Sequence, residues 1–323
     1  MKKLLLLSCL IYISQISQSQ TAIDANDIGA GKSLIEAYFS PFGNALGASL
    51  NNGWYNTAKP HKLGGFDLTF TLNTVLINNE YKSFDVKDVI NGTNFSLTNN
   101  GDQETPTFLG SGSGIDLNYL DENGITQEFR LPAGISAVGA IPLPMLQGGV
   151  GLIKGTEIDI RYIPLTEIGK VGEINMFGIG FKHDILQWIP LASVLPISVS
   201  IQGGHTSVNT GIKIQEQDVE LKVRANTFNL LVSKKILMLT GYAGVGYNSS
   251  TTAFKVNEKY SIGTGGNSIT FDAESLSELK FETENDFRMN LGFRFQLAIL
   301  AIQANYTLSK YPVATVGVGI SIR

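Results

Sequence analysis

Apolar and polar residues alternate strictly along several long stretches of this chain. Because successive side chains of a β-strand point to opposite faces, each stretch predicts a strand with one apolar and one polar face. A soluble sheet buries its apolar face, whereas a membrane barrel turns that face toward lipid, so the pattern alone leaves two interpretations open. The clearest apolar parity comprises Phe287, Met289, Leu291, Phe293, Phe295 and Leu297, and similar stretches occur at 66–76, 157–162, 219–226, 237–249, 252–262, 299–308 and 313–322.

The length and the charges of these stretches favour the membrane barrel. Membrane strands have about 9–11 residues, whereas soluble strands usually have about 5–6. Lipid cannot satisfy an open sheet edge, so a spanning sheet must close. The predicted fold is all-β, a closed antiparallel transmembrane β-barrel of about 14 strands, within a range of roughly 12–16, over residues 65–323. The alternative is an exported soluble β protein. Charges on the polar parity are predicted to face a hydrated lumen: Asp159, Arg161, Lys222, Arg224, Arg288 and Arg294.

Residues 1–20 are predicted to be a cleaved secretory signal peptide. Lys2 and Lys3 precede the apolar run LLLLSCLIYIS, and the small polar segment QISQSQ follows. Cys9 is the only cysteine and lies in this segment, so a mature chain has no disulfide, thiolate nucleophile or cysteine metal site. With 24 basic and 28 acidic residues, nothing indicates a nucleic-acid partner. The expected location is the outer membrane of a Gram-negative bacterium.

Residues 21–64 precede the first strong strand and have a different pattern. They contain a short helical pattern that Pro41 is expected to end, followed by glycines and asparagines. We predict a plug that contains a short helix and folds into the lumen, and the alternative is an extension packed beneath the barrel. The plug residues expected to line a ligand path are Leu34, Tyr38, Phe42 and Trp54.

The stretch 131–153 carries no charge. Its prolines and glycines argue against a helix, so it is interpreted as an irregular apolar segment that collects a ligand; ordinary glycine-rich strands are the alternative. The residues proposed for that role are Leu131, Ile135, Ile141, Leu143, Met145 and Leu146. A second apolar interruption follows His183, where Trp188 is expected to anchor a short helix at the membrane interface.

Catalytic patterns are sparse. The three histidines are scattered, so no metal site is predicted, and no cofactor motif is found. GAGKS, residues 29–33, lacks the glycine that a phosphate-binding loop needs before it. The chain is therefore not expected to be an enzyme, with a lipid hydrolase as the alternative.

Several blocks resemble an uncharacterised outer-membrane β-barrel family of Bacteroidota-type bacteria: LIEAYFSPF, LNNGWYNTAKPHKLGGFDLTF, GIGFKHDILQWIP, GYAGVGYNSS and ANYTLSKYPVATVGVGISIR. One departure from barrels generally is the C-terminus, which ends in Ile322-Arg323 rather than in an aromatic residue. The plug suggests the architecture of FadL-like fatty-acid channels by analogy. The expected function is a passive channel for a small hydrophobic or amphipathic molecule. The alternatives are a structural or interaction barrel without an open pathway and, third, a lipid-modifying enzyme. Expected partners are outer-membrane lipid, a small apolar ligand and the barrel-assembly machinery.

Overall fold

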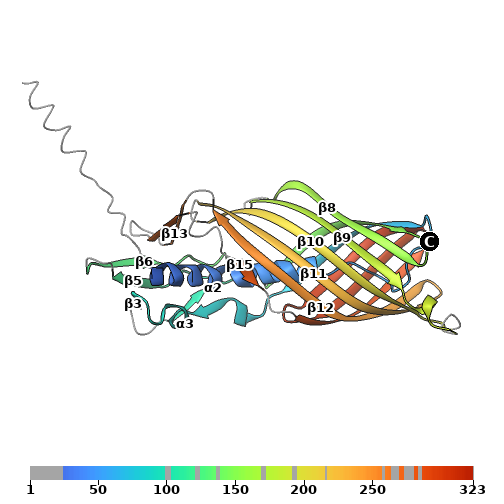
Figure 1. The fold of residues 1–323 in the computed structure, drawn as a ribbon, viewed down its shortest axis with the longest axis horizontal. Helices are drawn as coiled ribbons and strands as arrows, with labels where there is room; N and C mark the ends of the chain where they lie inside the picture. The colour runs from blue at the N-terminus through green and yellow to red at the C-terminus, as the bar shows by residue number, and fades with distance from the viewer. Residues whose placement is uncertain are drawn as a thin grey trace, which may run out of the picture.

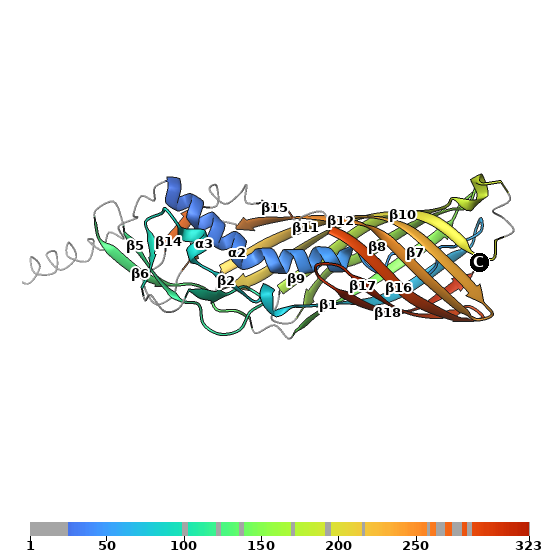
Figure 2. The same ribbon diagram turned by 90° about the horizontal axis from the view of Figure 1, so that it is seen from below.

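The computed structural model describes residues 25–98, 103–120, 124–135, 139–168, 172–190, 195–214, 217–256, 259–262, 269–272, 280–282 and 286–322. The predicted signal peptide lies outside these residues. The molecule is elongated, with a β-barrel at one end and a smaller head at the other (Figure 1). A long helix runs from the head into the barrel, as both views show (Figure 2).

The barrel is closed by antiparallel hydrogen bonding all the way round. Its ring contains 10 strands in the described part of the chain, and β11 and β12 pair to close it. The ring strands are β1 (Phe66–Leu76), β7 (Ala140–Gly151), β8 (Thr156–Ile168), β9 (Gly172–Asp184), β10 (Ser198–Ile214), β11 (Gln217–Ile236), β12 (Leu239–Val256), β16 (Asp286–Leu297), β17 (Leu300–Leu308) and β18 (Val313–Ile322).

The prediction of about 14 strands is therefore wrong. Some strands are longer than expected, with 20 residues in β11 and 18 in β12. The stretches 237–249 and 252–262 were predicted as two strands, but most of their residues belong to the single strand β12. The described residues between 77 and 139 form no wall strand, because they build the head.

The two ends of the barrel differ in their connections. At the end that holds the C-terminus, tight turns join β7 to β8, β11 to β12 and β16 to β17, with positive φ at Lys154, Leu237 and Ala298. At the other end lies the head, defined as residues 77–139. Its elements are η1 (Asn79–Tyr81), β2 (Ser83–Asp85), α3 (Lys87–Ile90), β3 (Phe95–Leu97), β4 (Glu104–Pro106), β5 (Asp116–Leu120) and β6 (Thr126–Arg130).

Short strands from the connection between β12 and β16 also lie at the head end (Figure 1). They are β13 (Lys259–Ile262), β14 (Ile269–Asp272) and β15 (Lys280–Glu282). The turn-end connection between β9 and β10 contains η2 (Leu186–Trp188). No helix in the described part of the chain is long and apolar enough to span a membrane.

Helix α2 (Ala25–Leu50) is much longer than the short helix predicted from the sequence. Pro41 lies inside it rather than ending it. Tertiary packing outweighs the lost backbone hydrogen bond, because the helix is enclosed by the head and by the barrel wall. Gly43 and Gly47 bring α2 so close to β12 that an added Cβ would overlap the side chains of Thr252 and Ser250.

The barrel has two zones along its axis. In β11, Leu221 and Asn229 lie on the same inward face and both are fully buried, whereas Lys222 and Phe228 are exposed on the outer face. Near the tight turns the outer face is thus apolar and the lumen polar; near the head the lumen is apolar and the outer face polar. Exposed apolar residues of the first zone include Phe66, Leu68, Phe70, Phe177, Ile179, Leu230, Phe293 and Phe295.

Candidate functional site

The lumen is filled along its length by the N-terminal segment. Helix α2 ends inside the barrel, and residues 51–65 continue to the tight-turn end, where β1 begins. Along this path Asn73 of β1 donates hydrogen bonds to the carbonyls of Ser49 (2.9 Å) and Asn52 (3.1 Å). Farther on, the amide of Ala58 donates to the Ser233 hydroxyl of β11 at 3.0 Å. The segment predicted as a plug thus contacts the inner wall at several positions along the barrel axis.

Two buried arginines hold the C-terminal end of α2. Arg161 of β8 donates to the carbonyls of Leu50 (2.8 Å) and Asn52 (2.7 Å). Arg288 of β16 donates to the Asn51 carbonyl (2.5 Å) and to the Asn52 side-chain oxygen (2.7 Å). The last carbonyls of a helix lack intrahelical partners and carry partial negative charge, so the guanidinium groups both satisfy and neutralise them.

Trp54 follows the C-terminal end of α2 and packs against the inner wall of the barrel. Its ring lies against Gly180 of β9 and Gly204 of β10, where an added Cβ would come within 2.6 Å and 2.5 Å of ring atoms. The Arg161 guanidinium covers the ring at 3.6 Å from its centroid, a cation–π contact. Glycines in these two strands therefore create the space that the tryptophan fills.

In the part of the lumen near the head, α2 and the wall pack against each other through apolar side chains. Phe39 of α2 lies 5.2 Å from Phe254 of β12, measured between ring centroids. Leu143 and Met145 of β7 belong to the same buried cluster. Polar contacts near the tight turns and apolar contacts near the head thus join the plug to the wall.

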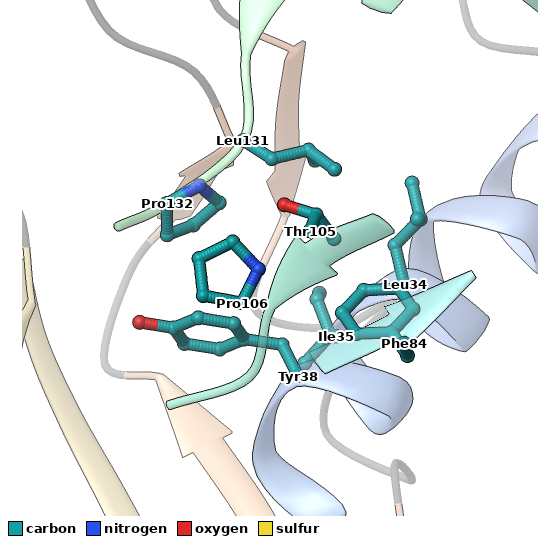
Figure 3. A pocket seen from close by; sticks show the side chains of 8 residues that line it. All are labelled: Leu34, Ile35, Tyr38, Phe84, Thr105, Pro106, Leu131 and Pro132. Carbon is teal, nitrogen blue, oxygen red and sulfur yellow. The ribbon is translucent and has the colours of Figure 1, made fainter. Parts of the chain in front are cut away.

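A small apolar pocket lies between α2 and the head. Three of the predicted ligand-path residues, Leu34, Tyr38 and Leu131, line it together (Figure 3). The pocket has about 10 Å³ of free space, room for roughly one water molecule. Tyr38 donates a hydrogen bond from its hydroxyl to the Ala133 carbonyl at 2.8 Å, and burial raises the pKa of the phenol. The remaining lining residues are Ile35, Phe84, Thr105, Pro106 and Pro132.

The other plug predictions fall at different heights. Phe42 packs against Phe108 of the head, with ring centroids 4.8 Å apart. Trp54 lies in the polar part of the lumen, nearer the tight turns than Phe42. The four predicted plug residues therefore do not form one path. Trp188 is exposed at the tight-turn end and donates to His183 at 2.9 Å; its role as an interfacial anchor stays a prediction.

Four of the six predicted lumen charges face the lumen and two do not. Asp159, Arg161, Arg288 and Arg294 are buried inside the barrel, and Arg294 donates to the side chain of Asn56 in the plug. Lys222 and Arg224, by contrast, are exposed on the outer face of β11. The prediction for these two residues is wrong because they lie in the zone near the head. In that zone the apolar residues of the strand face inward and pack on α2.

The apolar stretch 131–153 is not irregular throughout; its role in collecting a ligand stays a prediction. Most of it is β7, a regular wall strand, so the alternative of a glycine-rich strand is correct for that part. Leu143 and Met145 point inward, Leu146 is exposed outward, and Ile141 packs against the buried cluster. Leu131 and Ile135 belong to the head, and of these two residues only Leu131 is buried. Two prolines are tolerated in β7, which keeps its pairing with β1.

A group of buried ionisable side chains at the tight-turn end escaped the sequence analysis. His61 of the plug contacts Glu157 of β8 at 2.7 Å, and Lys182 of β9 contacts the same carboxylate at 2.6 Å. Asp67 of β1 lies 3.9 Å from the imidazole. Their positions on the inward parity of the strands were a usable signal, but the plug histidine could be placed beside them only by the tertiary fold.

Solved structures similar to this chain include bacterial outer-membrane proteins. Ail of Yersinia pestis is 14% identical, with 52% of this chain and 98% of that chain covered and a TM-score of 0.26. The transport unit of the autotransporter AIDA-I from Escherichia coli is 9% identical, with coverages of 89% and 99% and a TM-score of 0.31. For the monoaromatic hydrocarbon channel TodX, a ΔS2S3 mutant, identity is 9%, coverages are 85% and 97%, and the TM-score is 0.28. Likenesses this weak carry no functional argument.

The sequence itself gives the family. No curated protein matches the chain. A family match extends over residues 1–322, almost the whole sequence. The chain therefore belongs to the family described as Family of unknown function (DUF6588).

Proposed function

We propose that the protein is an outer-membrane barrel without an open pathway, which presents its head as an interaction surface outside the cell. The plug carries this proposal, because it crosses the lumen lengthwise and is hydrogen-bonded to opposite walls through Arg161 and Arg288. Contact with outer-membrane lipid and insertion by the barrel-assembly machinery are part of the same proposal.

The apolar outer belt supports the membrane location. A soluble protein rarely exposes a continuous apolar surface of this extent. Strand β16 has 12 residues, and at about 3.3 Å per residue and a tilt of about 45° it rises about 28 Å, close to the apolar band of about 25 Å on outer-membrane barrels.

The connections support the orientation. Outer-membrane barrels have short periplasmic turns and longer extracellular loops. The tight turns and the C-terminal end of β18 lie together at one end, so the head at the other end would face the medium. The helical N-terminal segment would emerge on that outer side as well.

Vesicle permeability tests the closed lumen. Full-length protein reconstituted in lipid vesicles is expected to add no permeability to small sugars beyond that of protein-free vesicles. A matched variant, T57C/S233C, can join plug and wall by a disulfide, because the two native hydroxyl oxygens lie 3.2 Å apart. Oxidising it should change nothing. If vesicles with wild-type protein let sugars through, the closed barrel is refuted. If oxidation of T57C/S233C then stops this permeability, the plug is movable.

Surface presentation is tested on intact cells. An epitope inserted at Gly92, in an exposed turn of the head, should bind antibody without permeabilisation. The matched control is an epitope at Leu237, in the tight turn after β11, which should bind only after permeabilisation. The reverse pattern would overturn the orientation.

Passive transport of a small apolar molecule is the second candidate. The meeting of Leu34, Tyr38 and Leu131 favours it, because these residues come from the plug and from the stretch predicted to collect ligand. The pocket that they line has room for roughly one water molecule, so it would have to widen to admit such a ligand. Mass spectrometry of protein extracted in mild detergent should then find a bound apolar molecule that the variant L34W, which fills the pocket, lacks. A wild type that carries none would count against this candidate.

A further inference from the structure

The tight-turn end of the lumen holds three buried carboxylates, one from β1 and two from β8, on either side of β7. Asp67 of β1 pairs with Gly149 of β7, and Gly149 pairs with Asp159 of β8, so the three residues form one row across the wall. Glu157 lies two residues from Asp159 on the same inward face. The exposed fractions of Asp67, Asp159 and Glu157 are 8%, 1% and 2%.

Gly149 lets these carboxylates converge. A Cβ added to it would lie 2.5 Å from Oδ1 of Asp67, 2.6 Å from Oδ1 of Asp159 and 3.6 Å from Oε1 of Glu157. A side chain at this position would push the two aspartates apart. The inner face of the wall therefore has an opening surrounded by oxygen atoms.

The cations nearby are already engaged. Lys182 and the backbone and side-chain nitrogens of His61 all bind Glu157. Arg161 donates to Gln147 and to the plug carbonyls rather than to a carboxylate.

The two aspartates, in contrast, each keep a buried oxygen without a hydrogen bond, Oδ1 of Asp67 and Oδ2 of Asp159. Thr69 donates to the second oxygen of Asp67, and Gln147 donates to that of Asp159. Burying a carboxylate without a counter-charge is costly, so this pair needs either a bound cation or a proton.

We propose that Asp67 and Asp159 bind a hard divalent cation, Ca²⁺ or Mg²⁺, above Gly149, with Glu157 and His61 at its edge. Such ions take carboxylate oxygens at about 2.0–2.6 Å, so ligands of one ion lie within about 5 Å of one another. Oδ1 of Asp67 and Oδ1 of Asp159 lie 2.5 Å and 2.6 Å from the same Cβ position at Gly149, so these two oxygens are at most about 5 Å apart. The ligand atoms of His61, Asp67 and Glu157, a group that does not include Asp159, lie within 4.8 Å of one another. The cation would join β1, β8 and the plug at one point, which goes beyond the proposed function and does not depend on it.

Metal content and chelation test the site in the wild-type protein, so the test does not depend on a variant that folds. Protein extracted without chelator is expected to carry about one Ca²⁺ or Mg²⁺ per chain by elemental analysis. EDTA should lower the temperature at which the folded band is lost on unboiled gels. Added Ca²⁺ or Mg²⁺ should raise that temperature in proportion to the logarithm of free cation.

Conservative variants locate the ion. D67N and D159N should each lose the metal and the response to EDTA, whereas the control D116N, in the exposed head, should keep both. Terbium luminescence sensitised by Trp54, whose ring lies on Gly180 beside Asp159, offers an independent readout that the same two variants should abolish. Absence of bound metal together with no response to EDTA or added cation would overturn the proposal and indicate a proton held between the aspartates. Metal retained in both variants would overturn it equally.

Discussion

Gly180 is predicted to be irreplaceable because of one neighbour, Trp54. In the variant G180A the new methyl group would lie 2.6 Å from Cζ3 and 2.8 Å from Cε3 of the indole. Ordinary carbon contacts need about 3.5–4.0 Å, so the ring must retreat by about 1 Å. It cannot do so freely, because the Arg161 guanidinium covers it at 3.6 Å and is itself hydrogen-bonded to the carbonyls of Leu50 and Asn52.

The magnitude follows from overpacking. Extra methyl groups in a close-packed interior cost about 1–3 kcal/mol, so G180A should destabilise the barrel by that amount. W54A removes a buried indole and should cost about 3–5 kcal/mol. In the double variant the methyl group keeps only one close neighbour, the Gly203 carbonyl oxygen at 3.1 Å, so most of the cost of G180A should be lost. The coupling energy between the two sites would then be about 1–3 kcal/mol and of compensating sign.

Urea unfolding in detergent micelles, followed by the shift of the folded band on unboiled gels, measures all four proteins without relying on tryptophan fluorescence. The matched control is G211A, where an added Cβ meets nothing within 4 Å, and its stability should stay within about 0.5 kcal/mol of wild type. Equal destabilisation by G180A with and without Trp54 would refute the argument that glycine is needed to seat the plug.

Three further predictions concern the helix and the head. G47L should destabilise the protein by about 1–3 kcal/mol in the same urea assay, since its side chain would collide with β12. The Asp116 carboxylate accepts two hydrogen bonds from Arg130, and these lower its pKa below the value in the unfolded chain. The ion pair therefore stabilises the fold above the unfolded pKa, and this stabilisation is lost as pH falls through the folded pKa. The variant R130Q should raise the pKa of Asp116 in an NMR titration. Burial beside Tyr81 raises the pKa of Tyr311 to about 12. The neutral phenol therefore contributes to stability below the unfolded pKa of about 10, and this contribution is lost as pH rises further. The absorbance difference between wild type and Y311F should titrate near pH 12.

Alternation along the chain was sufficient to predict an all-β barrel with outward-facing apolar residues such as Phe293, but not its strand number. A period of two shows that a strand exists, yet it does not show whether 237–262 is one strand or two. The same limit explains Lys222, because alternation looks identical whether the apolar parity faces lipid or faces a helix. Helix α2 itself was shortened in the prediction because Pro41 usually ends a helix, and only the surrounding wall shows why it continues.

The contacts of the plug indicate that it is part of the fold rather than a removable stopper. Removing it would deprive Arg161 and Arg288 of the plug carbonyls that now accept hydrogen bonds from them. The glycines that receive Trp54 would border a void, and the apolar upper lumen would be exposed to water. Each loss costs free energy, so the wall and the plug stabilise one another. A barrel built this way holds the N-terminal helix and the head firmly at one of its ends.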